Sequence, residues 1–232
     1  MPSADPVERV RDALLRGRMS LDDLTTRRVG AMFGKTTSLL YHHYGSLDGF
    51  LFAVSQSGMR LLGEHLGAAA AAGADLSGLA DAFVAFGLRS PALYALMFER
   101  KFDWAALRRA GALHPELPGL SMFAVLGEYL RAAGSEKPVR DARMLFAALH
   151  GLVSLAHSGR ANIGDTKTTD HAAAREAARE ITRRICPGTV RSDHEPSSNS
   201  GSSPSSQRRR ASQPARQGRD ERAARGRRRR AE

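Results

Sequence analysis

Apolar and polar residues alternate along most of this chain with the period of an α-helix. Between Pro6 and Arg184 the apolar side chains recur three or four positions apart, and the strict alternation of a half-buried strand never persists. Leu79, Phe83 and Phe86 are one such set. This spacing places the apolar residues on one face of each helix. The pattern therefore predicts an all-α protein.

Signals at the ends of the apolar runs divide this region into separate helices. Pro6 and Pro91 each suit the first turn of a helix. The helix that starts at Pro6 is predicted to end at Gly17, and the helix that starts at Pro91 is predicted to have Ser90 as its N-cap. Ser46 is the predicted N-cap of a helix over 47–62, which the glycine- and alanine-rich stretch LGAAAAAGAD should end as a linker. A proline-punctuated loop is expected at 114–118. Further helices are predicted at 121–133, 138–158 and 170–185.

Two short helices are predicted in the segment LTTRRVGAMFGK-TTSLLYHHYGS. Thr25 can cap the first, whose inward residues are Val29, Met32 and Phe33, and Gly34 can adopt the positive φ that ends it. Thr36 can cap the second, in which Leu40 and Tyr44 share one face and anchor it to the first. The side chains left facing outward suit contacts with phosphates and base edges: Thr37, Ser38, Leu39, Tyr41, His42 and His43. A helix-turn-helix explains this mixture, and the alternative is an ordinary surface helix with solvated histidines.

The same segment resembles the DNA-binding domain of the TetR family of bacterial transcriptional regulators. The resemblance covers roughly residues 6–62, and a looser one, in FVAFGLRSPALYALMFER and LFAALHGLVSLAHSG, extends it to most of 6–186. It implies that Thr26 contacts a phosphate and Arg27 a base at the start of the first helix. It further implies base contacts from Thr37, Ser38, Leu39 and His42, and phosphate contacts from Thr36, Tyr41 and His43. Lys35 and Leu47 depart from the family pattern, which usually has a valine-like residue and a lysine at these positions.

Aromatic and sulfur-containing residues mark a candidate ligand site in the later helices. Such residues more often belong to an ordinary hydrophobic core than to a ligand site. The TetR resemblance, however, implies an effector cavity here, in which aromatic residues with a polar group can orient a mainly apolar ligand. The candidate residues are Phe98, Trp104, Met122, Tyr129, Phe146 and His150. Small residues in the last two predicted helices suit a two-fold four-helix interface between two copies: Ala147, Ala148, Gly151, Ala174, Ala177 and Ala178.

Charge and composition narrow the class of protein. The net charge of +11 is concentrated after residue 186, where 12 Arg and 5 acidic residues stand among serine, glycine and proline, so that 187–232 is predicted to be a disordered basic tail. One cysteine, no apolar signal segment and no run long enough to span a bilayer favour the cytoplasm and no membrane partner. The histidines lack metal-binding spacing, and no catalytic or phosphate-binding motif occurs. We therefore expect no enzyme, metal or cofactor.

These observations and the TetR resemblance predict three parts: a three-helix helix-turn-helix DNA-binding domain at 1–45, a helical ligand-binding and dimerisation bundle at 46–186, and the tail. The expected function is that of a ligand-responsive transcriptional regulator, a repressor, which binds double-stranded operator DNA as a homodimer. A small, mainly apolar effector would release it. The alternative is a non-specific nucleic-acid-binding protein that acts through the basic tail.

Overall fold

The computed structural model describes residues 5–32, 37–113, 118–162 and 167–185. Within these residues every regular element is a helix and no strand occurs, which confirms the all-α prediction. The helices are α1 (Pro6–Leu15), α2 (Thr26–Met32), α3 (Thr37–Tyr44), α4 (Leu47–Ala71), α5 (Leu76–Arg89), α6 (Pro91–Phe98), α7 (Trp104–Arg109), α8 (Pro118–Ala132), α9 (Pro138–His157) and α10 (Asp170–Ile185). The predicted loop at 114–118 and the tail at 187–232 fall largely or wholly outside the described residues.

Side-chain caps and glycines set the helix ends. The carboxylates of Asp5, Asp75 and Asp103 and the hydroxyl of Ser46 each accept a hydrogen bond from a first-turn backbone N–H, at 2.8–3.1 Å. These bonds satisfy donors that the helix itself leaves unpaired. Glycines with positive φ follow the other end of several helices, as Gly134 does after α8. The prediction that Ser46 caps the long central helix is confirmed.

Helix α4 is longer than its sequence predicts. It continues past Leu62 to Ala71, so the stretch LGAAAAAGAD begins as helix and is not a linker throughout. Alanine has the highest helix propensity, and the run of alanines outweighs the interruptions at Gly63 and Gly67. The chain leaves the helix only at Gly73, where φ is +85°.

Two features around α6 also differ from the prediction. Ser90 stands at the N-cap position, but its hydroxyl makes no capping bond and instead donates to the Leu15 carbonyl oxygen at 3.3 Å. This bond joins the end of α1 to the start of α6. The short helix α7 was not predicted, because its six residues contain too little of an apolar repeat to show a period.

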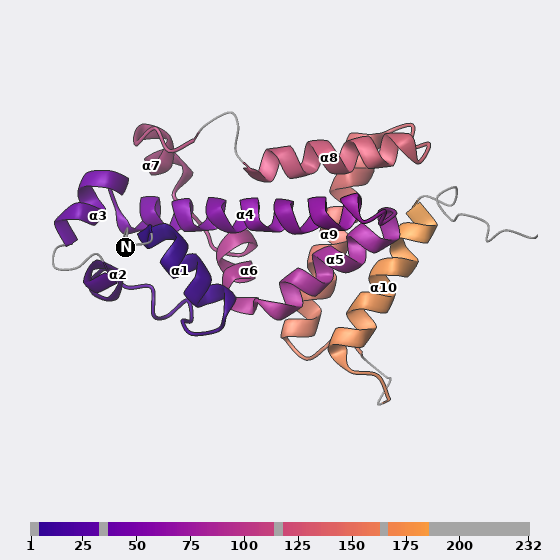
Figure 1. Ribbon diagram of the computed structural model, residues 1–232, viewed down its shortest axis with the longest axis horizontal. Coiled ribbons are helices and arrows are strands. Elements are labelled where there is room, and N and C mark those ends of the chain that lie inside the picture. Colours follow the sequence, from indigo (N-terminus) through magenta and orange to yellow (C-terminus); the bar gives the residue numbers. More distant parts are fainter. Residues whose placement is uncertain (1–4, 33–36, 114–117, 163–166, 186–232) are drawn as a thin grey trace, which may run out of the picture. The chain divides into compact units, whose positions relative to one another are not determined.

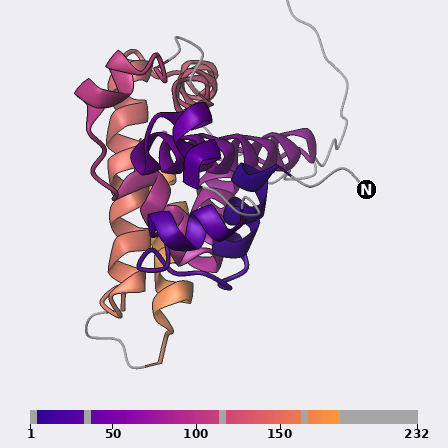
Figure 2. The same cartoon turned by 90° about the vertical axis from the view of Figure 1, so that its left-hand side faces the viewer.

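Helix α4 lies at the centre of the packing. It contacts α1, α3, α5, α6 and α8, and Figure 1 shows it running between the N-terminal helices and the later bundle. α8 lies along it in the same direction, while α5, α9 and α10 pack together at its C-terminal half. Viewed from the side of the N-terminal helices, α2 and α3 stand in front of the bundle (Figure 2).

Some of the small residues expected at an interface between copies pack within the chain instead. Ala174 and Ala178 on α10 are fully buried, where α10 packs closely against α5 and α9. Arg175 and Asp81 form an ion pair across the contact between α10 and α5. Ala174 and Ala178 are therefore unavailable to a second copy, which corrects the expectation drawn from their size.

No helix in the described ranges is by itself both long and apolar enough to cross a membrane. Among the described helices, α5 and α6 reach the length and composition only when taken together, and they are bent by 109° at their junction.

Candidate nucleic-acid interface and apolar cavity

Helix α2 begins as its sequence predicts. The Thr25 hydroxyl accepts a hydrogen bond from the Arg28 backbone N–H at 3.3 Å, and Val29 is fully buried. Thr26 is partly buried in the first turn, while Arg27 is exposed and has no hydrogen-bond or ion-pair partner among the described residues. A guanidinium that the protein itself does not bind is available to a partner.

Arg28, the neighbour of Arg27, is held by the protein. Its Nη1 lies 2.7 Å from the Asp23 carboxylate. Hydrogen bonds from the backbone N–H and hydroxyl of Ser20 lower the pKa of Asp23, with a further contribution from the charge of Arg28. Asp23 therefore stays ionised, and Arg28 is in an ion pair at the surface, whereas Arg27 is not.

Helix α3 has one buried edge and one exposed face. Leu40 is fully buried, and the half-buried Tyr44 ring meets Phe50 of α4 edge to face with centroids 5.1 Å apart. Tyr41 is 51% exposed, and His42 and His43 are also exposed, their two rings edge to face. The pair Leu40 and Tyr44 thus anchors the helix, and a tyrosine and two histidines remain outside.

Part of the predicted interface lies outside the described residues. This applies to Phe33, Gly34, Lys35 and Thr36, which connect α2 to α3. Thr37, Ser38 and Leu39 form the first residues of α3, but their side chains are not described. Their predicted base contacts therefore stay predictions.

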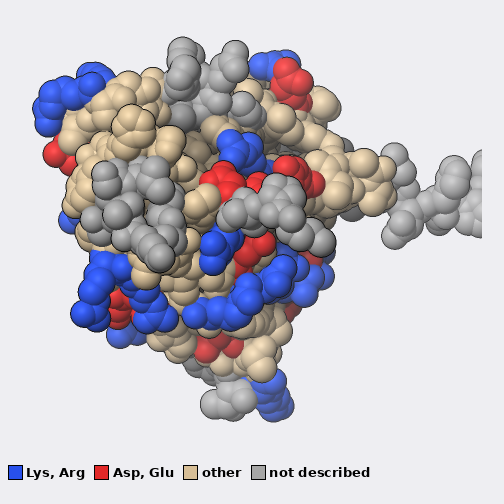
Figure 3. All heavy atoms as spheres, turned by 60° about the vertical axis from the view of Figure 1, so that its left-hand side comes forward, with Lys and Arg blue, Asp and Glu red and all other residues tan. Residues whose placement is uncertain are grey.

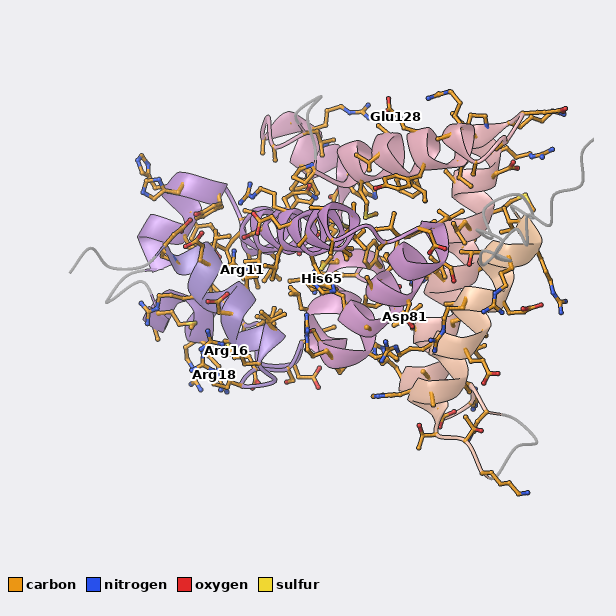
Figure 4. The ribbon with its side chains drawn as sticks, turned by 45° about the vertical axis from the view of Figure 1, so that its right-hand side comes forward. Arg11, Arg16, Arg18, His65, Asp81 and Glu128 are labelled. Carbon is orange, nitrogen blue, oxygen red and sulfur yellow. The ribbon has the colours of Figure 1, made fainter. Side chains whose placement is uncertain are left out.

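Basic side chains surround the exposed face of the N-terminal helices. Figure 3 shows Lys and Arg gathered on this side of the molecule with acidic residues among them. The exposed arginines here are Arg9, Arg16, Arg18, Arg27 and Arg28. In Figure 4, Arg16 and Arg18 lie near each other beyond the end of α1. Such a surface lowers the electrostatic cost of approaching a polyanion.

An ion pair links the start of α4 to the segment that follows α6. Arg100, two residues after α6, places Nη2 2.7 Å from the Asp48 carboxylate in the first turn of α4. The Arg100 guanidinium also lies over the Phe102 ring, 5.7 Å from its centroid. The junction between α3 and α4 is therefore tied to the segment that follows α6.

A cavity of about 440 Å³ lies between α4, α5, α8 and α9. Its wall is almost wholly apolar, and Arg60, Glu64 and Tyr129 are the polar residues that line it. Of the predicted ligand residues, Met122, Tyr129 and Phe146 belong to this wall. The cavity has the size and the apolar lining of a small-molecule site.

Two further predicted ligand residues, Phe98 and His150, lie outside that lining. They belong to an aromatic cluster next to the cavity, in which His150 stacks on the Phe146 ring at 7° and on the Tyr94 ring at 22°. The Tyr94 hydroxyl lies 2.8 Å from Nδ1 of His150, and burial raises the pKa of Tyr94 well above its ordinary value. Tyr94 therefore stays protonated, and its hydrogen bond to His150 engages both side chains within the core.

Trp104 lies away from the cavity. It begins α7, is 55% exposed, and meets Phe52 and Phe102 edge to face. Its residue type and the TetR resemblance grouped it with the other candidate ligand residues, but the turn after Phe98 carries α7 to the first half of α4 instead. Trp104 is not part of the cavity wall.

The sequence did not point to the part of the cavity that α4 provides. Met59, Arg60, Gly63, Glu64, Leu66, Gly67 and Ala70 all line it, whereas the prediction placed a linker over the last three of these. The signal was present in the three- and four-residue spacing of this set, which continues across the expected break. No group of three or more His, Cys, Asp or Glu side chains suited to a metal ion occurs in the described part of the chain.

Comparison with known proteins agrees with this architecture. Residues 76–185 match the family of Tetracyclin repressor-like C-terminal domains. No curated protein shows significant sequence similarity to the chain. Among solved structures, a protein of unknown function from Rhodococcus sp. RHA1 is 22% identical, covers 79% of this chain and 95% of its own, and superposes with a TM-score of 0.59. The candidate regulatory protein SCO4313 is 20% identical over 75% of this chain and 95% of its own, with a TM-score of 0.52.

The two structures share the fold of this chain, and the family match gives that fold a name. The family match covers α5 to α10, and three of these helices, α5, α8 and α9, contribute to the wall of the cavity. The match confirms the resemblance to the TetR family, and residues 76–185 are a tetracyclin repressor-like C-terminal domain.

Proposed function

We propose that this TetR-like transcriptional regulator is a homodimeric repressor that binds operator DNA through α2 and α3 and leaves it when an apolar effector enters the cavity. The observation that carries the proposal is the arrangement of α3. It buries Leu40, exposes Tyr41, His42 and His43, and leads through Gly45 into α4, which also forms one wall of the cavity. Regulators of this family are generally not enzymes, and we propose no enzymatic activity for this chain.

The exposed groups of α2 and α3 suit the two kinds of DNA contact. Arg27 can donate two hydrogen bonds to one guanine, and His42 can reach a base edge from the outer face of α3. Tyr41, His43 and Thr26 can donate to phosphates, which positions the helix without selecting a sequence. In this proposal Thr36 adds a phosphate contact, and Thr37, Ser38 and Leu39 contact bases at the start of α3.

A second copy would dock on the outer face of α9. Its exposed or half-exposed residues Met144, Ala147, Gly151 and Leu155 follow one another at helical spacing, and a Cβ added at Gly151 would meet no other atom within 4 Å. Gly151→Arg should therefore leave the monomer folded and place a charge in the interface. Sedimentation of this variant as a folded monomer is the expected result, and a dimer of unchanged stability would refute this docking face.

The cavity and the DNA-binding helices share α4. Suppose that α4 has one arrangement that binds DNA and one that does not. A ligand that binds the second arrangement more favourably by about 1.4 kcal/mol would lower operator affinity tenfold. Because binding linkage is reciprocal, operator DNA must lower the affinity for that ligand by the same factor.

Selection of bound fragments from a random double-stranded DNA library tests the proposal. A homodimer with two reading helices should select an inverted repeat whose half-sites lie about 34–36 Å apart, or a multiple of this distance. A single selected half-site would contradict dimeric reading. Recovery of DNA without any sequence preference would instead favour non-specific binding through the basic tail.

A further inference from the structure

We propose that the cavity binds an elongated amphipathic anion, with its apolar chain between α4 and α8 and its acidic head group at Arg60. The inference rests on the effector role proposed above for this cavity and names the chemical class of its ligand. Three features of the cavity carry it: two glycines in its wall, the parallel course of α4 and α8, and the position of its few polar groups.

The two glycines leave open space in the wall that α4 provides. Gly63 and Gly67 lie one turn apart inside α4, and a Cβ added at either would meet no atom within 4 Å. Glycine disfavours a helix interior, and here no neighbouring side chain of the chain requires its small size. The space over these two residues is instead open to a ligand that crosses α4 at close range.

The parallel course of α4 and α8 makes the cavity long. At one end Met59 of α4 lies near Gly119 of α8, because a Cβ added at Gly119 would lie 4.0 Å from the Met59 Sδ. At the other end Ala70 of α4 and Tyr129 of α8 both belong to the wall. Figure 1 shows the two helices side by side over this length. From Met59 to Ala70 a helix rises about 16 Å, so the space suits an extended chain better than a compact ring system.

The positively charged groups of the cavity lie at one of its ends. Arg60 is exposed at the end where α8 begins, and it has no hydrogen-bond or ion-pair partner among the described residues. The N-terminal turn of α8, which contributes Pro118 to the same end, adds the positive end of its helix dipole and contains no acidic residue. A guanidinium can bind a carboxylate through two parallel hydrogen bonds.

The acidic side chains near the cavity are consistent with this placement of the head group. Glu64 lies one turn beyond Arg60 and would repel an anion that entered deeper along α4. Glu128 is exposed on α8, and Figure 4 shows it on the side of that helix away from α4. The remaining wall is apolar apart from Tyr129, so the charged end of the ligand belongs beside Arg60.

Calorimetric titration of the full chain with three matched probes tests the inference. Dodecanoate, dodecanol and dodecyltrimethylammonium share one chain and differ in head-group charge. The two ionic probes are used below their critical micelle concentrations, and dodecanol is used below its solubility limit. Dodecanoate should bind at least tenfold more tightly than the other two. Equal affinities, or a preference for the cation, would overturn the inference.

Three variants locate the binding site. Arg60→Met should remove the preference for dodecanoate, and Glu64→Gln should keep or strengthen it. Gly67→Leu fills the open space, so it should weaken all three probes at least tenfold while the free protein melts at the same or a higher temperature. Unchanged binding by Gly67→Leu would show that the chain lies elsewhere.

A separate titration with operator DNA distinguishes this inference from the proposed function. If dodecanoate binds through Arg60 but leaves DNA affinity unchanged, the ligand class is correct and the proposed release from DNA is wrong. If the protein selects an operator but binds none of the probes, the DNA-binding proposal stands and the amphipathic-anion site is refuted.

Discussion

Two adjacent residues of α3 should respond in opposite ways to truncation. Leu40 is fully buried, so Leu40→Ala removes packing and leaves a cavity, which costs about 2–5 kcal/mol of folding free energy. Tyr41 is 51% exposed, and no ring contact involves it among the described residues. Tyr41→Ala should therefore change the free energy of unfolding by no more than about 0.5 kcal/mol.

The effect of Tyr41→Ala on DNA binding should be large. A hydrogen bond from its hydroxyl to a charged phosphate contributes about 1.5–3 kcal/mol, which corresponds to roughly a tenfold to hundredfold loss of affinity at each half-site. Because phosphates carry no sequence information, the loss should be similar for preferred and altered operators. Arg27→Ala, in contrast, should cost about 1–3 kcal/mol and relax the preference at one base pair.

Urea denaturation and fluorescence anisotropy with labelled operator measure the two quantities separately. Tyr41→Phe is the matched control, because it keeps the ring and removes only the hydroxyl. The assignment of the exposed face of α3 to DNA fails if Tyr41→Ala binds operator as tightly as the wild type. It also fails if this variant loses as much stability as Leu40→Ala.

Three further predictions concern other parts of the chain. Gly87→Ala would place its Cβ 2.8 Å from Cγ1 of Val153, so it should lower the free energy of unfolding, measured with urea, by about 1–3 kcal/mol. A Cβ at Gly127 would meet no atom within 4 Å, so Gly127→Ala should raise this free energy by about 0.5–1 kcal/mol. Equal effects of the two variants would refute the packing argument. Burial lowers the pKa of His157, so the unfolded chain binds more protons below about pH 6.5 and stability should fall there; His157→Gln should reduce that fall, and an unchanged pH profile would contradict it. Deletion of 187–232 should make the salt dependence of DNA binding shallower and leave the selected sequence unchanged, whereas loss of sequence preference would show that the tail reads bases.

Local signals in the sequence were sufficient for most of the fold. The caps at Thr25 and Ser46 depend on a side chain and a backbone N–H three residues away, so they can be inferred without knowledge of the tertiary structure. The anchoring of α3 through Leu40 follows from helical periodicity in the same way. The extent of α4 was missed because the glycine-containing stretch from Leu66 onward suggested a break, while the helix propensity of the alanines after Gly67 decided the outcome.

The cavity could be predicted only in part, because its wall depends on how helices are arranged in space. Residue type and the TetR resemblance identified Met122 and Phe146 as candidate ligand residues. An all-helical core contains several spaces between helices, however, and residue type does not say which space a side chain enters. His150 enters the one beside Tyr94, and Trp104 reaches the surface because α7 turns away from the bundle. Arg60, which no apolar pattern marks, borders the cavity.

The unbroken course of α4 determines how the molecule can deform. Its 25 residues form a rod about 37 Å long, in which every turn is bound to the next. A glycine-alanine linker after Leu62 would bend locally and absorb a push at the cavity. A continuous rod instead turns as a whole, and a tilt of about 5° displaces one end by about 3 Å relative to the other. A displacement at Gly67 therefore changes the orientation of the whole helix, including its first turn after Ser46, without any part of the helix having to unfold.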